Sequence, residues 1–92
     1  MIIRILSEGQ FDVPDDALDE LNRLDSTLEA AVEAADEQGL AEALAELLRR
    51  VRERGDPVAL DALVPSDLVL PHESATLAEV RDLMSEEGLI PG

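Results

Sequence analysis

The first fourteen positions of the chain carry two short apolar runs separated by a polar turn. Residues 2–6 are β-branched or leucine apart from Arg4, and residues 10–13 alternate between polar and apolar side chains. Short runs of this kind are typical of β-strands, and the glycine between them, Gly9, is typical of a tight bend. The pattern predicts a β-hairpin with its bend at Gly9.

Apolar residues then recur at intervals of three and four, the spacing of one face of an α-helix. Pro14 and the two aspartates that follow it suit the first turn of a helix. Gly39 interrupts the pattern and Gly55 ends it. We therefore expect two antiparallel helices joined by a tight turn, over residues 15–36 and 40–54. Their main apolar stripes are Leu21, Leu24, Leu28, Ala31 and Ala35, and then Leu40, Leu44, Leu47 and Val51.

The last third of the chain predicts one more strand and one more helix. Residues 67–70, Asp-Leu-Val-Leu, lie between Pro65 and Pro71 and indicate a strand. Thr76 and Glu79 have the spacing of a capping box, so a helix should begin there and stop at Gly88. Its apolar positions are Leu77, Val80, Leu83 and Met84. The next apolar pair is Leu89 and Ile90, which either folds back onto the core or extends an edge of the sheet.

The predicted order of elements, β-β-α-α-β-α, indicates an α+β fold in a single domain over residues 1–92. We expect a short, mainly antiparallel sheet packed against a helical hairpin and a C-terminal helix. The spacing of the helical stripes also suits a coiled-coil partner, but it extends over only about three heptads. We therefore expect the stripes to pack within the hairpin. Strand 10–13 would invite a symmetric dimer if it formed a free edge, although Asp12 and Pro14 could equally guard that edge.

Charge is the strongest compositional signal. The chain has 7 arginines, no lysine and 22 acidic residues, for a net charge of −15, yet 46% of it is apolar. A disordered acidic tail would be poor in core-forming residues, so this composition indicates a folded domain. Acidity without lysine suggests a GC-rich genome and fits a halophile, since concentrated salt screens self-repulsion. An acidic domain of an ordinary bacterium is the alternative.

The composition also excludes several classes of protein. Phe11 is the only aromatic residue, so base-stacking platforms are missing and nucleic-acid binding is not expected. Without cysteine there is no disulfide and no cysteine-ligated zinc. The apolar runs are too short for a membrane-spanning helix or for the core of a signal peptide. We expect a cytoplasmic protein that meets a membrane only through a partner.

No pattern for catalysis or metal binding is present. The acidic residues around the first helix start lack the spacing of a calcium loop, so they are expected to serve the helix dipole: Asp12, Asp15, Asp16, Asp19 and Glu20. His72 is the sole histidine and follows a proline in a loop. A glycine-flanked nucleophilic serine and a phosphate-binding glycine loop are both missing. Hydrolysis by paired carboxylates is disfavoured because few side chains suit a pocket. We expect no enzyme activity, no cofactor and no metal.

Four of the seven arginines fall within six positions at the end of the second predicted helix: Arg49, Arg50, Arg52 and Arg54. Positive charge suits a helix C-terminus, and Glu46 can pair with an arginine three or four positions later. The first interpretation is that these arginines stabilise the end of the helix. The second is that they form a docking patch for an acidic surface. Together with Phe11, they are the candidates for contact with a partner.

Two segments carry a resemblance to a known family. They are Glu-Gly-Gln-Phe-Asp-Val-Pro at 8–14 and Val-Pro-Ser-Asp-Leu-Val-Leu-Pro at 64–71, supported by shorter matches at 3–5, 18–22 and 86–92. The chain resembles the PspA-associated family, small proteins encoded beside phage-shock protein A in archaea and actinobacteria. The resemblance implies a non-enzymatic role next to PspA, a peripheral coiled-coil protein that protects or remodels stressed membranes. It supplies no catalytic residues.

The sequence therefore predicts an adaptor or regulator that binds PspA through the helical hairpin or a sheet edge and tunes the membrane-stress response. Such a protein would be peripheral to the membrane through PspA. The alternative is an acidic inhibitor or nucleic-acid mimic that binds a basic protein by electrostatics. Added salt should weaken the second kind of binding steeply and the first kind less.

Overall fold

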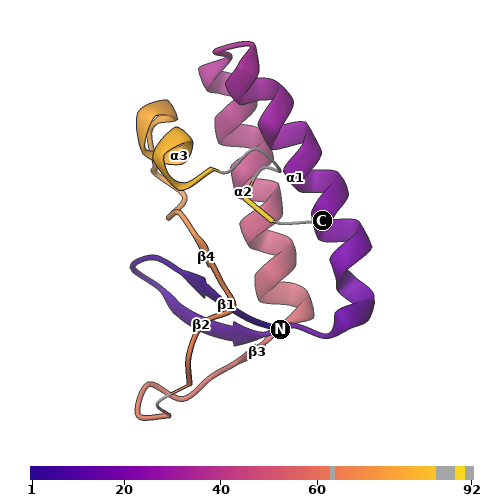
Figure 1. The fold of residues 1–92 in the computed structure, drawn as a ribbon, viewed down its shortest axis with the longest axis vertical. Helices are drawn as coiled ribbons and strands as arrows, with labels where there is room; N and C mark the ends of the chain where they lie inside the picture. The colour runs from indigo at the N-terminus through magenta and orange to yellow at the C-terminus, as the bar shows by residue number, and fades with distance from the viewer. Residues whose placement is uncertain (63, 85–88, 91–92) are drawn as a thin grey trace.

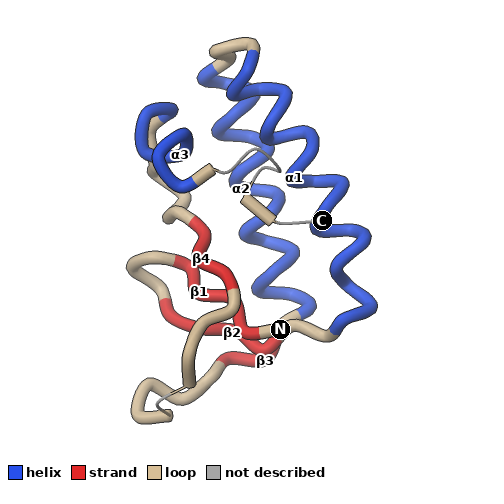
Figure 2. Tube along the Cα trace, viewed as in Figure 1, coloured by secondary structure: helices blue, strands red, loops and turns tan. Residues whose placement is uncertain are grey.

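The structure is a computed structural model that describes residues 1–62, 64–84 and 89–90. The described residues form a four-stranded sheet in the order β3-β2-β1-β4, in which β1 and β4 are parallel and the other pairs antiparallel. The strands are β1 (Ile2–Ile5), β2 (Gly9–Asp12), β3 (Asp56–Pro57) and β4 (Leu68–Leu70). Figures 1 and 2 show the sheet beside one end of a long helical hairpin, with α3 (Leu77–Leu83) on the same side. The α+β prediction is confirmed.

The β1-β2 turn differs in detail from the prediction. Gly9 is the first residue of β2, paired with Ile5, and the turn itself contains Ser7 in a left-handed conformation with φ 71°. Gly9 has φ 134°, a backbone conformation that side chains rarely adopt. The glycine is therefore needed where the strand begins, one step beyond the bend.

The helical hairpin consists of α1 (Leu18–Glu33) and α2 (Glu37–Arg54), with a single 3-10 turn at Asp15–Ala17 before α1. The predicted break at Gly39 is wrong: Gly39 lies in the first turn of α2. The break comes earlier, at Ala35, whose φ of 52° reverses the chain. Asp36 then caps α2 by accepting a hydrogen bond from the Gly39 amide at 3.0 Å.

Strand β3 was not predicted, and it covers the edge of strand 10–13, which the sequence had left open as either free or guarded. Asp56 and Pro57 pair with Asp12 and Phe11, and the Val58 amide donates to the Gln10 carbonyl at 2.9 Å. The outer edge of β2 is therefore occupied by the chain's own β3. At the other end of the sheet, β4 has one strand neighbour among the described residues, β1.

Gly55 makes the β3 contact possible. A Cβ atom there would lie 2.7 Å from the Val51 carbonyl oxygen and 2.9 Å from the Phe11 Cβ. These distances are shorter than real contacts, so only glycine lets the end of α2 approach β2 this closely.

The C-terminal part confirms the capping box and one of the two alternatives for the last apolar pair. Thr76 accepts a hydrogen bond from the Glu79 amide, and the Glu79 side chain accepts one from the Thr76 amide, each at 3.2 Å. The helix ends at Leu83, earlier than expected, because Met84 is already extended; the predicted stop at Gly88 lies outside the described residues. Leu89 and Ile90 fold back and are buried in the core.

The core lies between one face of the sheet and the hairpin. Along β1, Ile3 and Ile5 are buried and Arg4 is exposed, as the two-residue period of a strand requires. The Gln10 side chain donates to the Val64 carbonyl at 2.8 Å, so the loop before β4 crosses part of the other face. The fully buried large side chains are Ile3, Ile5, Leu21, Leu28, Leu44, Leu47, Leu48, Leu70, Ile90, Val13, Val51 and Val80.

Candidate functional site

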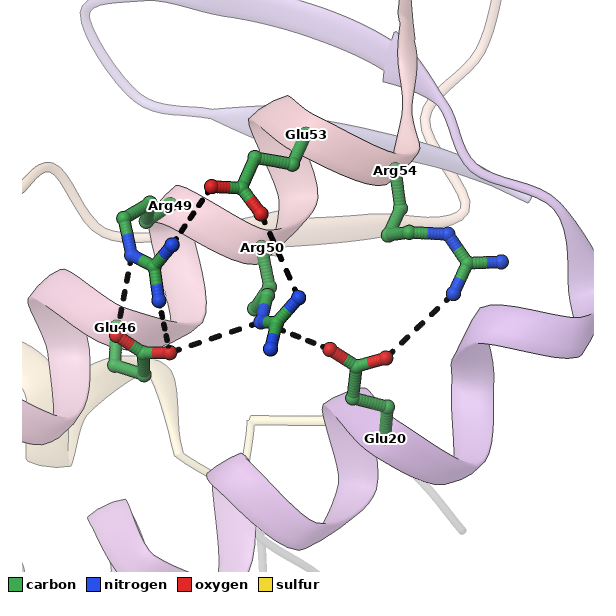
Figure 3. Close-up of polar contacts among 6 residues, drawn as sticks. All are labelled: Glu20, Glu46, Arg49, Arg50, Glu53 and Arg54. Carbon is green, nitrogen blue, oxygen red and sulfur yellow. Dashed lines mark hydrogen bonds and ion pairs between the residues drawn. The ribbon is translucent and has the colours of Figure 1, made fainter.

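The arginine cluster predicted from the sequence lies at the C-terminal end of α2. Figure 3 shows Arg49 between two carboxylates of the same helix: it is bound to Glu46 and lies 2.7 Å from Glu53. The hydrogen bond from Arg49 holds the pKa of Glu46 below its usual value. The expected pairing of Glu46 with a later arginine is thus present.

Two further arginines connect α2 to the beginning of α1. The Arg50 Nε lies 2.9 Å from a Glu20 oxygen, and the other Glu20 oxygen lies 3.5 Å from Arg54 (Figure 3). Arg54 also donates to Asp16 at 2.7 Å. These contacts join the two ends of the hairpin that lie farthest from its turn.

Arg52 connects α2 to the sheet side of the molecule. Its Nε donates to both oxygens of Glu8, in the β1-β2 turn, at 2.8 and 3.1 Å. Its guanidinium also lies 3.8 Å from Glu73, ahead of α3. The four arginines of the cluster thus face six carboxylates, a local charge of 4 − 6 = −2. The described contacts connect the cluster to α1 and to the sheet side and leave it with an excess of carboxylates, so an acidic partner would first have to displace internal ion pairs.

Phe11, the other candidate for partner contact, is half-buried. The register pairs it with Ile3, so both side chains share the sheet face that meets the core. Its Cβ lies next to Gly55, one residue after the last arginine of the cluster. The structure therefore brings Phe11 close to the arginine end of α2, and the phenyl ring packs against the core.

Several of the other polar candidates have structural partners. Asp16 and Glu20 of the predicted acidic group bind arginines, and within the described ranges no three metal-ligating side chains come together. The His72 Nδ1 accepts a hydrogen bond from the Ser74 amide at 3.2 Å, and its Nε2 lies 3.7 Å from Glu79. The two imidazole nitrogens thus face Ser74, ahead of α3, and Glu79, in the first turn of α3. Ser7 lines the same hollow as His72, of about 280 Å³, without a hydrogen bond between them in the described contacts.

Asp25 is a buried charged residue that the sequence reasoning missed. It lies on α1, is only 3% exposed, and accepts hydrogen bonds from the Leu89 and Ile90 amides at 3.0 Å each. Burial raises the pKa of this carboxyl, although the two amide hydrogen bonds act in the opposite direction. Its spacing of four from Leu21 and three from Leu28 was the available signal, because it places an acid on an apolar helix face.

The opposite flank of α1 is open. A hollow of about 490 Å³ runs between α1 and α2, near the hairpin turn. Leu24 and Ala31, expected to pack within the hairpin, are only half-buried and line this hollow. The remaining lining residues are Thr27, Ala30, Ala34, Asp36, Gly39, Glu42, Ala43 and Glu46. The small side chains leave a groove where leucines would have filled the space.

Taken across the described residues, no helix is both long enough and apolar enough to cross a membrane. A family model described as PspA-Associated protein (PspAA) matches residues 1–92. No curated protein and no solved structure matches the chain. Because the family match extends over the full length, with the hairpin, the sheet and the C-terminal segment all inside it, the chain belongs to the PspA-associated family.

Proposed function

We propose that this protein is a non-enzymatic adaptor that binds a PspA-like coiled-coil protein and thereby regulates a membrane-stress response. The observation that carries the proposal is the family match over residues 1–92, because the family is described by its association with PspA. Contact with the membrane would then come through the partner.

The arrangement of polar groups supports recognition over catalysis. The arginine cluster is bound to internal carboxylates, and both nitrogens of His72 face their own neighbours. A long helical hairpin with an open groove is, in contrast, a surface on which a helix can dock.

An acidic inhibitor of a basic protein is the second candidate. The net charge of −15 favours it, as does the excess of carboxylates even around the arginine cluster. Binding of this kind is electrostatic, so it should disappear when salt reduces the screening length to about 3 Å at 1 M. A complex with a buried apolar contact should persist under the same conditions.

Co-purification tests the proposal. The tagged protein is mixed with the PspA-like protein encoded in the same genome, and binding is measured by calorimetry at low salt and at about 1 M salt. An unrelated coiled coil of matched length and charge is the control. We expect micromolar or tighter binding to the PspA-like protein alone, retained at high salt. No association at micromolar concentration would contradict the proposal, and loss of binding in salt would favour the acidic inhibitor.

A further inference from the structure

The open groove has walls from two helices and a floor of small residues. Every lining residue belongs to α1, α2 or the turn between them. The distance along α1 from Leu24 to Ala34 is ten residues, or about 15 Å at 1.5 Å per residue, which matches roughly three turns of an added helix. The groove therefore has the length and direction of a site for a third helix.

Small side chains decide how close such a helix can come. Ala31 and Ala43 form the floor, and Gly39 lies at the turn end. Interaxial distances between packed helices fall to about 8 Å where the side chains at the contact are small. A partner helix with one narrow ridge of larger apolar residues would fill the hollow of about 490 Å³.

The charges along the groove determine which residues are favoured beside the apolar ridge of that helix. The ionisable residues that line it are all acidic: Asp36, Glu42 and Glu46. Glu46 is already bound to Arg49, so the negative charge of the rim comes from Asp36 and Glu42. Glu42 is exposed, and the side chain that donates a hydrogen bond to it at 3.4 Å, Gln38, is neutral and forms no ion pair with it. In helical assemblies, charged residues beside the apolar seam determine which partner is accepted. An acidic rim favours lysine or arginine at these flanking positions.

We propose that the groove between α1 and α2 binds an amphipathic helix whose narrow apolar ridge is flanked by basic residues. The identification of the protein that supplies this helix rests on the proposed function; the groove and its preference for basic flanks do not. The other side of α1 is closed by the chain's own Leu89 and Ile90, so this groove is the flank of the hairpin on which an added helix completes the packing.

Two adjacent residues of α1 provide a matched pair of variants. Thr27 lines the groove and Ser26 does not, both are exposed, and each hydroxyl donates to a backbone carbonyl four residues earlier. Thr27→Arg places a long positive side chain inside the groove. Ser26→Arg makes the same charge change about 100° around the helix. General attraction between an acidic protein and a basic peptide changes equally in both variants.

The probe is a three-heptad helical peptide with a leucine seam and lysine at the flanking positions, compared with the same peptide carrying glutamate there. Binding is followed by calorimetry and by amide chemical shifts. We expect the lysine peptide to shift amides in 24–34 and 36–46. Thr27→Arg should weaken it by about tenfold or more, and Ser26→Arg by less than about twofold. The inference is overturned if the two variants weaken binding of the lysine peptide equally, or if the shifted amides lie outside 24–34 and 36–46. It is also overturned if the glutamate peptide binds as tightly as the lysine peptide, or if the lysine peptide does not bind at about 1 mM.

The same two variants are then tested against the PspA-like protein. If Thr27→Arg binds the PspA-like protein more weakly and Ser26→Arg does not, both the groove and the proposed function are supported. If both variants bind it as the wild type does, the proposed function is supported, but the groove is not the site of that binding. If the wild-type protein does not bind the PspA-like protein, the proposed function fails, and the peptide titration decides the groove by itself.

Discussion

The two flanks of α1 show how one amphipathic helix can be closed on one side and open on the other. On the closed flank, Leu28 is fully buried and Asp25 fixes the backbone of Leu89 and Ile90. On the open flank, only two positions from Asp25, Thr27 faces the groove beside alanines. The closed flank uses large side chains and internal hydrogen bonds, whereas the open flank leaves its contacts to another molecule.

Truncation of an apolar side chain on the closed flank should have the largest effect on the free energy of unfolding. Leu28→Ala removes a fully buried side chain, so the free energy of unfolding should fall by about 2–5 kcal/mol. Ala30→Leu, on the exposed open flank, should change it by less than about 0.5 kcal/mol. Urea unfolding of both variants is the measurement. Equal losses would contradict the distinction between the flanks.

Removal of the buried carboxylate comes second. Asp25→Ala leaves the Leu89 and Ile90 amides without their acceptor, which should cost about 2–4 kcal/mol because each unsatisfied buried donor is expensive. Thr27→Ala is the control and should stay within about 0.5 kcal/mol of the wild type. Hydrogen exchange adds a local readout: the two amides should lose protection in Asp25→Ala. Unchanged exchange there would show that Asp25 does not hold the segment.

The turn that joins α1 to α2 should allow a stabilising change. Ala35 has φ 52°, a left-handed conformation that disfavours a Cβ atom. Ala35→Gly should raise the free energy of unfolding by about 0.5–1 kcal/mol, after the loss of backbone entropy is subtracted. Ala34 has φ −80°, so Ala34→Gly should destabilise slightly and serves as the control. Thermal melts compare the two, and a lower melting temperature for Ala35→Gly would contradict the argument.

The smallest effect concerns pH. Burial raises the pKa of Asp25 above 3.8, so the folded state binds this proton more readily than the unfolded state. The contribution of Asp25 to stability therefore improves as pH falls through the raised pKa and levels off below 3.8.

The variant Asp25→Asn isolates this contribution. The stability of the wild type minus that of Asp25→Asn should grow from neutral pH toward 3.8. The opposite trend comes from Glu46 and Glu79, whose lowered pKa values favour the folded state above 4.5, and it is shared by both proteins. A difference that stays constant or shrinks on acidification would refute the assignment to Asp25.

Several features of the fold could be predicted because their signals are local. The helical stripes, the capping box at Thr76 and the pairing of Glu46 depend on residues within one or two turns of each other. Strand β3 gave no such signal, since Asp56 and Pro57 have low β-propensity and pair only because Gly55 lets α2 approach β2.

The contacts of the arginine cluster also divide into local ones, which the sequence predicted, and distant ones, which it did not. The sequence indicated the arginines as a cluster, and their pairing with Glu46 followed from helical spacing. Their remaining partners come from distant elements: Glu8 lies 44 positions before Arg52, and Asp16 lies 38 positions before Arg54. Only the folded chain shows that carboxylates outnumber the arginines at the cluster. It also shows that the open groove lies toward the hairpin turn, with Glu46 at the border of both.

By itself the sequence determined the α+β class, the two long helices and the acidic charge, because periodicity, capping and composition act at short range or over the whole chain. The tertiary structure alone decided which flank of α1 is closed. The contact that closes it joins Asp25 to Leu89, 64 positions away, and no local pattern encodes which distant backbone a buried carboxylate will hold. The same packing left the alanine-lined flank without a cover in the described chain, and that flank is where we expect recognition.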